Sequence, residues 1–67
     1  MSTLVFDNES VTFDGEKSIA EVLIANGIKP SLVMVRVNGE VVIREQYESF
    51  IVPEGAEVKV YPFVGGG

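Results

Sequence analysis

The chain has 67 residues, ten of them acidic and five basic, and a formal net charge of -5. A chain of this length forms a single domain with one small core, and 46% hydrophobic residues are enough for a globular fold. It contains no cysteine and no histidine, which excludes thiol nucleophiles, disulfides, Cys/His metal sites and imidazole acid–base chemistry. The acidic balance disfavours nucleic acid as a partner. We expect neither a bound cofactor nor a metal.

The start of the chain, residues 1–6, has no basic segment followed by an apolar run, as a secretory signal would have. Elsewhere no apolar stretch approaches the ~20 residues of a membrane span. The absence of cysteine suits a reducing compartment. We therefore expect a cytoplasmic protein with no membrane segment.

Two short stretches of alternating apolar and polar residues, 3–6 and 11–14, predict the first two strands. Turn-forming residues occupy 7–10 between them, so the two strands are expected to form a hairpin. Successive side chains of a strand point to opposite faces. The side chains expected to face the core are Leu4, Phe6, Val11 and Phe13.

A short helix is predicted next, because Ser18 is followed three residues later by Glu21, the pattern of a capping box. Gly27 stands where a left-handed residue would end the helix. An apolar stripe at helical spacing is made by Ile19, Val22 and Leu23. A helix of roughly two turns is unstable alone, so it must pack against a sheet.

Residues 33–37 alternate cleanly and predict a third strand, and Asn38-Gly39 predicts a tight hairpin turn into a strand over 41–43. Residues 44–50 have no clean period and are expected to be irregular or to form a single turn.

A turn at 53–55 precedes the last strand, over 57–61. In that strand Val58 and Val60 are expected to point inward and Tyr61 outward. The order of elements predicts an α+β domain over residues 1–62, with one helix across one face of a mixed sheet, and a flexible glycine tail over residues 63–67.

Three consecutive glycines, Gly65, Gly66 and Gly67, end the sequence. At ~7% glycine usage such a run arises by chance roughly 3 times in 10,000. One interpretation is a flexible linker. The other is a segment that enters a narrow channel of another protein, since glycine allows close backbone approach. Phe63 and Val64 lead into the glycines as native sequence would, which favours the second interpretation.

Extended, residues 63–67 would reach roughly 17 Å beyond the domain. The reactive group would then be the carboxylate of Gly67, with Gly65 and Gly66 forming the part that threads. A carboxylate is a poor electrophile, so a partner must activate it. The chain itself is expected not to be an enzyme.

The sheet face opposite the helix is a candidate docking surface for such a partner. The residues expected to gather there are Val5, Met34, Arg36, Lys59, Tyr61 and Phe63. We expect partner contacts from Met34, Tyr61, Phe63 and Val64. The alternative is that Tyr61 and Phe63 only cover the edge of a small core.

Two other kinds of site are weaker candidates. Glu45 and Glu48 lie close in sequence, but an acid–base pair needs a cleft, and we expect this region to be exposed. No Gly-x-x-x-x-Gly-Lys-Ser/Thr run is present for phosphate binding.

Three segments together resemble the ThiS type of sulfur carrier, a member of the ubiquitin-like ThiS/MoaD superfamily that serves thiazole synthesis for thiamine. They are VNGE at 37–40, REQY at 44–47 and the ending FVGGG at 63–67. The resemblance covers essentially the whole chain. It implies a β-grasp fold with the last strand parallel to the first in the centre of the sheet.

The resemblance further implies that an E1-like adenylyltransferase of the ThiF type activates Gly67 with ATP, the ATP site belonging to the partner. The product would be a thiocarboxylate that gives its sulfur to a thiazole synthase of the ThiG type. Several alternatives share the fold and the di-glycine end. They are a MoaD-type small subunit of molybdopterin synthase, a carrier for another sulfur acceptor, a ubiquitin-like protein modifier, and a plain interaction domain.

Overall fold

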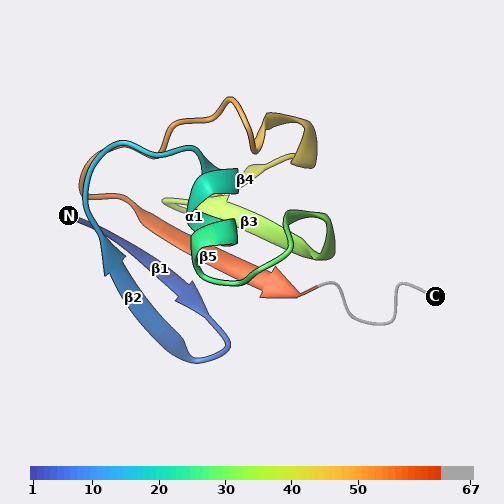
Figure 1. The fold of residues 1–67 in the computed structure, drawn as a ribbon, viewed down its shortest axis with the longest axis horizontal. Helices are drawn as coiled ribbons and strands as arrows, with labels where there is room; N and C mark the ends of the chain where they lie inside the picture. The colour runs from blue at the N-terminus through green and yellow to red at the C-terminus, as the bar shows by residue number, and fades with distance from the viewer. Residues whose placement is uncertain (63–67) are drawn as a thin grey trace.

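One mixed sheet with a single helix across one face makes up the fold (Figure 1). The computed structural model describes residues 1–62 of the chain. Its strands are β1 (Ser2–Phe6), β2 (Glu9–Phe13), β3 (Val33–Val37), β4 (Glu40–Val42) and β5 (Glu57–Pro62). The helix is α1 (Ile19–Ala25), and single 3-10 turns lie at Pro30–Leu32 and Arg44–Gln46.

The strands lie in the order β2-β1-β5-β3-β4. The last strand, β5, is parallel to β1 and antiparallel to β3. This confirms the predicted α+β class and the β-grasp topology, in which the last strand lies centrally beside the first. Among residues 1–62, no helix is long and apolar enough to cross a membrane.

The first hairpin forms as predicted but with a tighter turn. Asp7 and Asn8 both have positive φ, and β2 starts directly after them at Glu9. Leu4 is buried, and Phe6 and Phe13 pack partly against the core. The prediction for Val11 was wrong: it lies opposite Leu4 but is 43% exposed. The reason is that β2 is an edge strand outside the cover of α1 (Figure 1).

The helix begins and ends where the sequence predicts. The Glu21 amide donates to Ser18 Oγ at 3.1 Å, and the Ser18 amide donates to Glu21 Oε1 at 3.0 Å, which completes the capping box. Gly27 has a φ of +74°, the left-handed conformation that ends a helix at low cost only in glycine. The buried face of α1 is directed at the sheet and includes Ile19, Val22 and Leu23.

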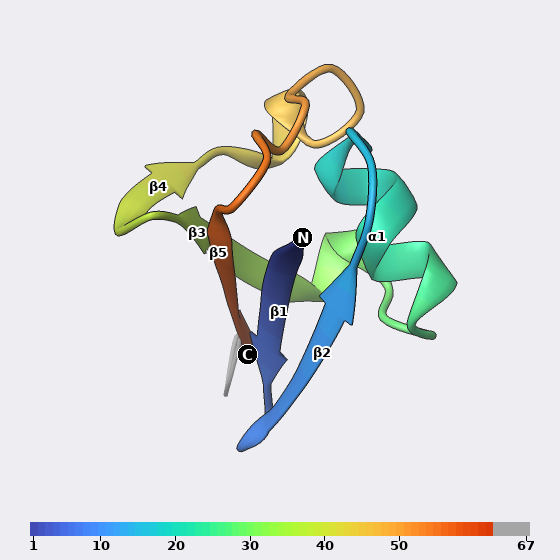
Figure 2. The ribbon, with the colours of Figure 1, turned by 90° about the vertical axis from the view of Figure 1, so that its left-hand side faces the viewer.

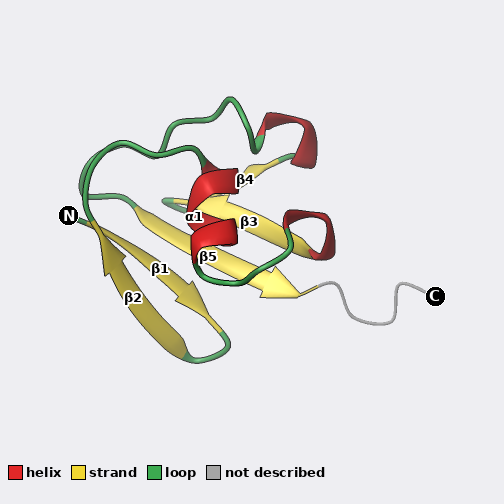
Figure 3. Ribbon diagram, in the orientation of Figure 1, coloured by secondary structure: helices red, strands yellow, loops and turns green. Residues whose placement is uncertain are grey.

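The second hairpin turns at Asn38 and Gly39, whose φ angles of 51° and 86° fit a type I′ turn. Strand β4 starts one residue earlier than predicted and ends at Val42. Ile43, expected as its last residue, lies beyond it and is exposed. Figure 3 shows the connection from β4 to β5 as loop broken by one short helical turn, as the lack of a period over residues 44–50 predicts.

This connection contributes to the core, which the sequence did not indicate. Tyr47 is only 3% exposed, and its hydroxyl donates to the Val33 carbonyl at 3.1 Å. Val52 and Ala56 from the same connection are also buried. The remaining core side chains come from the helix, its C-terminal end and the inner face of the sheet: Leu4, Ile19, Ala20, Val22, Leu23, Ile28, Val33, Val35, Val37, Val42, Val58 and Val60.

Candidate functional site

Strand β5 determines where the chain leaves the domain. Its inward side chains Val58 and Val60 are buried, and it pairs with a neighbour on each side. Its first residue is held by two bonds, from the Asn38 amide to the Glu57 carbonyl at 2.9 Å and from the Glu57 amide to Asn38 Oδ1 at 3.0 Å. A strand anchored in this way cannot slip in register, so the position of Pro62 at its other end is defined.

The face of the sheet opposite α1 has no element of residues 1–62 packed over it (Figure 2). Across that face Met34 lies opposite Tyr61, and Arg36 lies opposite Lys59. Val5 flanks Lys59 on the β1 side, and Val41 flanks Arg36 on the β4 side. We call this surface the outer face, defined by Val5, Met34, Arg36, Val41, Lys59 and Tyr61.

The register confirms that five residues predicted to share a face do so: Val5, Met34, Arg36, Lys59 and Tyr61. Tyr61 points to the face of the sheet opposite the core and is 39% exposed, so its side chain does not cover the core. The Arg36 guanidinium carbon lies 5.9 Å from the centre of the Tyr61 ring, within the range of a cation–π contact.

Sequence reasoning missed Val41, whose side chain is 54% exposed on the outer face. The signal was present in the Asn38-Gly39 turn. A two-residue turn pairs Val37 with Glu40, and therefore Arg36 with Val41, so both must point to the same side. The outer face is thus broader and more apolar than predicted.

The row of the outer face nearest the end of β5 is made by Met34 and Tyr61, and Asp7, which follows β1, lies close to Tyr61. The next row along the strands has a basic centre, Arg36 and Lys59, between two valines. Such a surface can receive an apolar contact close to the point where the chain leaves the sheet. The other residues predicted for the site, Phe63, Val64, Gly65, Gly66 and Gly67, lie outside the described residues.

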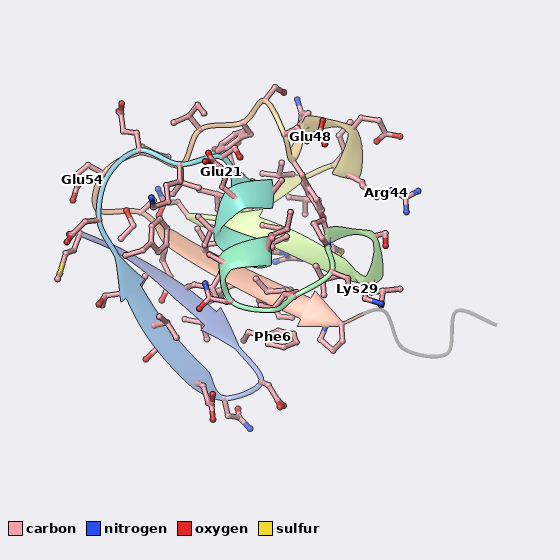
Figure 4. The ribbon with its side chains drawn as sticks, in the orientation of Figure 1. Phe6, Glu21, Lys29, Arg44, Glu48 and Glu54 are labelled. Carbon is pink, nitrogen blue, oxygen red and sulfur yellow. The ribbon has the colours of Figure 1, made fainter. Side chains whose placement is uncertain are left out.

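The carboxylates of the described residues do not form a reactive site. Glu45 and Glu48 are both exposed, and Glu48 projects outward in Figure 4. Among residues 1–62, no three acidic side chains gather into a group that could hold a metal ion. Hydrogen bonds from the Ser18 amide and hydroxyl lower the pKa of Glu21, which reflects its role in the helix cap.

An uncovered sheet face next to the end of a central last strand, with one helix behind the sheet, defines a ubiquitin-like β-grasp domain. Comparisons with known proteins identify one family within this ubiquitin-like class. A model of the ThiS family matches residues 3–67. The chain therefore belongs to the ThiS family, small proteins that carry sulfur.

Two solved structures of a thiamine biosynthesis protein (ThiS) from Geobacter metallireducens are similar to this chain. The crystal structure is 32% identical, with a TM-score of 0.74 over 97% of this chain and 99% of that one. The solution structure is also 32% identical, with a TM-score of 0.69 over 97% of this chain and 87% of that one. No curated protein matches the chain.

Proposed function

We propose that this protein carries sulfur as a thiocarboxylate on Gly67 and delivers it to thiazole synthesis for thiamine. The observation that carries the proposal is the family match, which extends through the glycines to residue 67. The similar structures from Geobacter metallireducens, described as thiamine biosynthesis proteins, support the pathway. The protein would act in the cytoplasm as a co-substrate of its partner enzymes, with no cofactor of its own.

The chemistry needs an activated acyl group, because a carboxylate alone resists attack. In the active site of an E1-like adenylyltransferase, a Gly67 carboxylate oxygen would attack the α-phosphorus of ATP and release pyrophosphate. Hydrosulfide released by the sulfur donor would then attack the acyl carbon, form the C–S bond and displace AMP with loss of a proton, leaving the thiocarboxylate. Residues 1–62 supply the docking surface, and residues 63–67 would act as the tail that enters the partner.

Intact-protein mass spectrometry tests this proposal. The protein is incubated with ATP, a ThiF-type enzyme of the same organism and a sulfur donor, and we expect oxygen-to-sulfur exchange located at Gly67. Gly66→Val serves as the matched variant: a branched side chain should block the channel and abolish adenylation, while the circular dichroism spectrum stays unchanged. If the unaltered protein is never adenylated, the carrier function is refuted.

The sulfur acceptor is tested with the thiocarboxylate form. It is offered in parallel to a thiazole synthase and to the large subunit of a molybdopterin synthase, and we expect transfer to the first. Specificity among related carriers is a difference of affinities, so a shared terminus does not determine it. Transfer only to the second enzyme would overturn the pathway but leave the carrier chemistry intact. Covalent adducts with lysines of other proteins would instead identify a modifier.

We further propose that Met34 and Tyr61 bind the activating enzyme, together with Phe63 and Val64. Met34→Glu should weaken binding strongly, because a carboxylate in the apolar centre of an interface is left desolvated and unpaired. Ile24→Glu is the control, since Ile24 is also an exposed apolar residue but lies on α1, on the other side of the sheet. Equal affinities of the two variants in titration calorimetry would show that the partner uses another surface.

A further inference from the structure

The dipeptide Asn-Gly occurs twice in the chain, as Asn26-Gly27 and as Asn38-Gly39. Asparagine followed by glycine is the sequence most open to spontaneous deamidation, because glycine has no side chain to hinder attack by its amide nitrogen on the asparagine side chain. Both asparagines and both glycines are exposed, so access of water is the same at the two places. Their hydrogen bonds, however, differ.

At the end of α1, the reacting groups of Asn26-Gly27 are occupied. The Gly27 amide, which would be the nucleophile, donates to the Ile24 carbonyl at 3.0 Å. The Asn26 side-chain nitrogen donates to the Val22 carbonyl at 2.8 Å, which holds the side chain against the last turn of the helix. Attack on the Asn26 side chain therefore has to break two hydrogen bonds that help to end the helix.

In the turn between β3 and β4, the corresponding groups are free. Of the hydrogen bonds formed within residues 1–62, none uses the Gly39 amide or the Asn38 side-chain nitrogen as donor. The Asn38 side-chain oxygen, Oδ1, accepts from the Glu57 amide at 3.0 Å. This oxygen is the atom on which negative charge develops when the Gly39 nitrogen adds to Cγ of Asn38.

The Glu57 amide is fixed in this position by the sheet. The Glu57 carbonyl accepts from the Asn38 amide at 2.9 Å, and Glu57 is the register partner of Thr3 on the other side of β5. A donor that already points at the oxygen where charge will develop lowers the barrier to addition without having to reorganise.

We propose that Asn38 is a site of spontaneous deamidation in the folded protein, with the Glu57 amide as the donor to the developing oxyanion, and that the helix end protects Asn26. Hydroxide removes the Gly39 amide proton, and the nitrogen forms a bond to Cγ of Asn38. The C–N bond of the side-chain amide then breaks, and the nitrogen leaves as ammonia with a proton from water. Water opens the resulting succinimide at either carbonyl, which gives aspartate or isoaspartate.

The isoaspartate product would disturb the anchor of β5. Opening of the ring at the backbone carbonyl adds one methylene to the main chain of a two-residue turn, and Oδ1 becomes a main-chain oxygen. Asn38 and Glu57 then no longer match in the geometry that fixes the first residue of β5. Aged protein should therefore unfold at a lower temperature than Asn38→Asp, in which the main chain keeps its length.

The test follows both sites in one sample. The unaltered protein is incubated at mildly alkaline pH in water labelled with heavy oxygen, so that only deamidation during the incubation is marked. Trypsin then separates Asn38, in the peptide 37–44, from Asn26, in the peptide 18–36. Mass spectrometry of the two peptides gives the two rates. A second incubation in guanidinium chloride gives the rates without the fold.

In the folded protein, Asn38 should react at least about tenfold faster than Asn26, because two hydrogen bonds protect Asn26. In the unfolded chain the two rates should be similar. Equal rates in the folded protein, or reaction of Asn38 only in the unfolded chain, would overturn the proposal.

Glu57→Pro tests the donor, because it removes the amide hydrogen at the first residue of a strand, where proline is tolerated. With a circular dichroism spectrum like that of the unaltered protein, this variant should deamidate at Asn38 about fivefold more slowly. An equal or faster rate would show that the Glu57 amide does not promote the reaction and would overturn its assigned role. If the variant does not fold, the comparison of Asn38 with Asn26 in the unaltered protein still decides whether Asn38 is the site.

Discussion

Tyr47 shows how one residue completes a sheet that its strands leave unfinished. Strand β4 ends at Val42, opposite Val35, so no β4 residue stands opposite Val33. The Val33 carbonyl accepts a hydrogen bond from the Tyr47 hydroxyl instead. Burial raises the pKa of Tyr47 above its usual 10.0, because the ionised form would lose its hydration. The side chain therefore links the irregular connection to the start of β3.

Tyr47→Phe should lower the free energy of unfolding by about 1 to 3 kcal/mol, because it leaves a buried carbonyl without a donor. Urea denaturation measures the loss, and Tyr61→Phe, on the outer face, should leave stability almost unchanged.

The pH dependence follows from the raised pKa of Tyr47. Below pH 10 its contribution is fully present, and it is lost as pH rises through the higher pKa of the folded state. Tyr47→Phe should therefore reduce the alkaline loss of stability. An equal decline in both proteins above pH 10 would contradict this assignment.

At the scale of elements, α1 depends on the connection that follows β4. The helix has seven residues, too few to be stable alone. Its first two amides donate to distant carbonyls, Ile19 to Phe50 at 3.1 Å and Ala20 to Tyr47 at 2.8 Å. The next amide is capped by Ser18. Amides that begin a helix have no partner within it, so these bonds explain how so short a helix starts at a defined place.

Ser18→Ala should lower the free energy of unfolding by about 1 kcal/mol through loss of the cap, whereas Ser18→Thr should retain most of it. Thermal unfolding followed by circular dichroism compares the two variants. Similar losses in both would mean that packing, and not the cap, positions the helix.

The cap also predicts an acid limb of stability. The pKa of Glu21 is lowered below its usual 4.5, so its contribution is present above that pH and is lost as pH falls through the folded-state pKa. Glu21→Gln should flatten this limb, because glutamine accepts the same hydrogen bond without titrating.

Features that a few neighbouring residues specify were predictable from the sequence. Features that depend on contacts between distant segments were not. The capping box at Ser18 and the Asn38-Gly39 turn each specify a conformation within four residues, and both were confirmed. Burial of Tyr47 and exposure of Val11 depend on where α1 and the connection pack. No periodicity encodes that packing, so it could be read only from the structure.

The candidate site also has features that the sequence predicts and features that only the structure shows. Alternation along β3 and β5 placed Met34 and Tyr61 on one face, and the register confirmed it. That Arg36 stands opposite Lys59 needed the pairing of two strands separated in sequence, which a single strand pattern does not contain. The roles of Phe63, Val64 and the three glycines remain proposals founded on family membership.

At the scale of the whole molecule, the position of each charge matters more than the total of -5. Lys59 adjoins Arg36 across the sheet, where like charges repel. Lys17 instead lies near Glu21 and helps to lower the pKa of that carboxyl, a favourable interaction. Removing either lysine makes the net charge one unit more negative, but the local fields at the two sites have opposite effects.

Lys59→Gln should therefore raise the free energy of unfolding by about 0.2 to 1 kcal/mol, whereas Lys17→Gln should lower it. Urea denaturation at low ionic strength measures both against the unaltered protein. In 1 M salt, where the screening length is about 3 Å, the two effects should shrink toward zero, because both side chains are exposed. If instead both variants lose stability equally at low salt, repulsion from the total charge dominates and the Arg36–Lys59 pair carries no penalty.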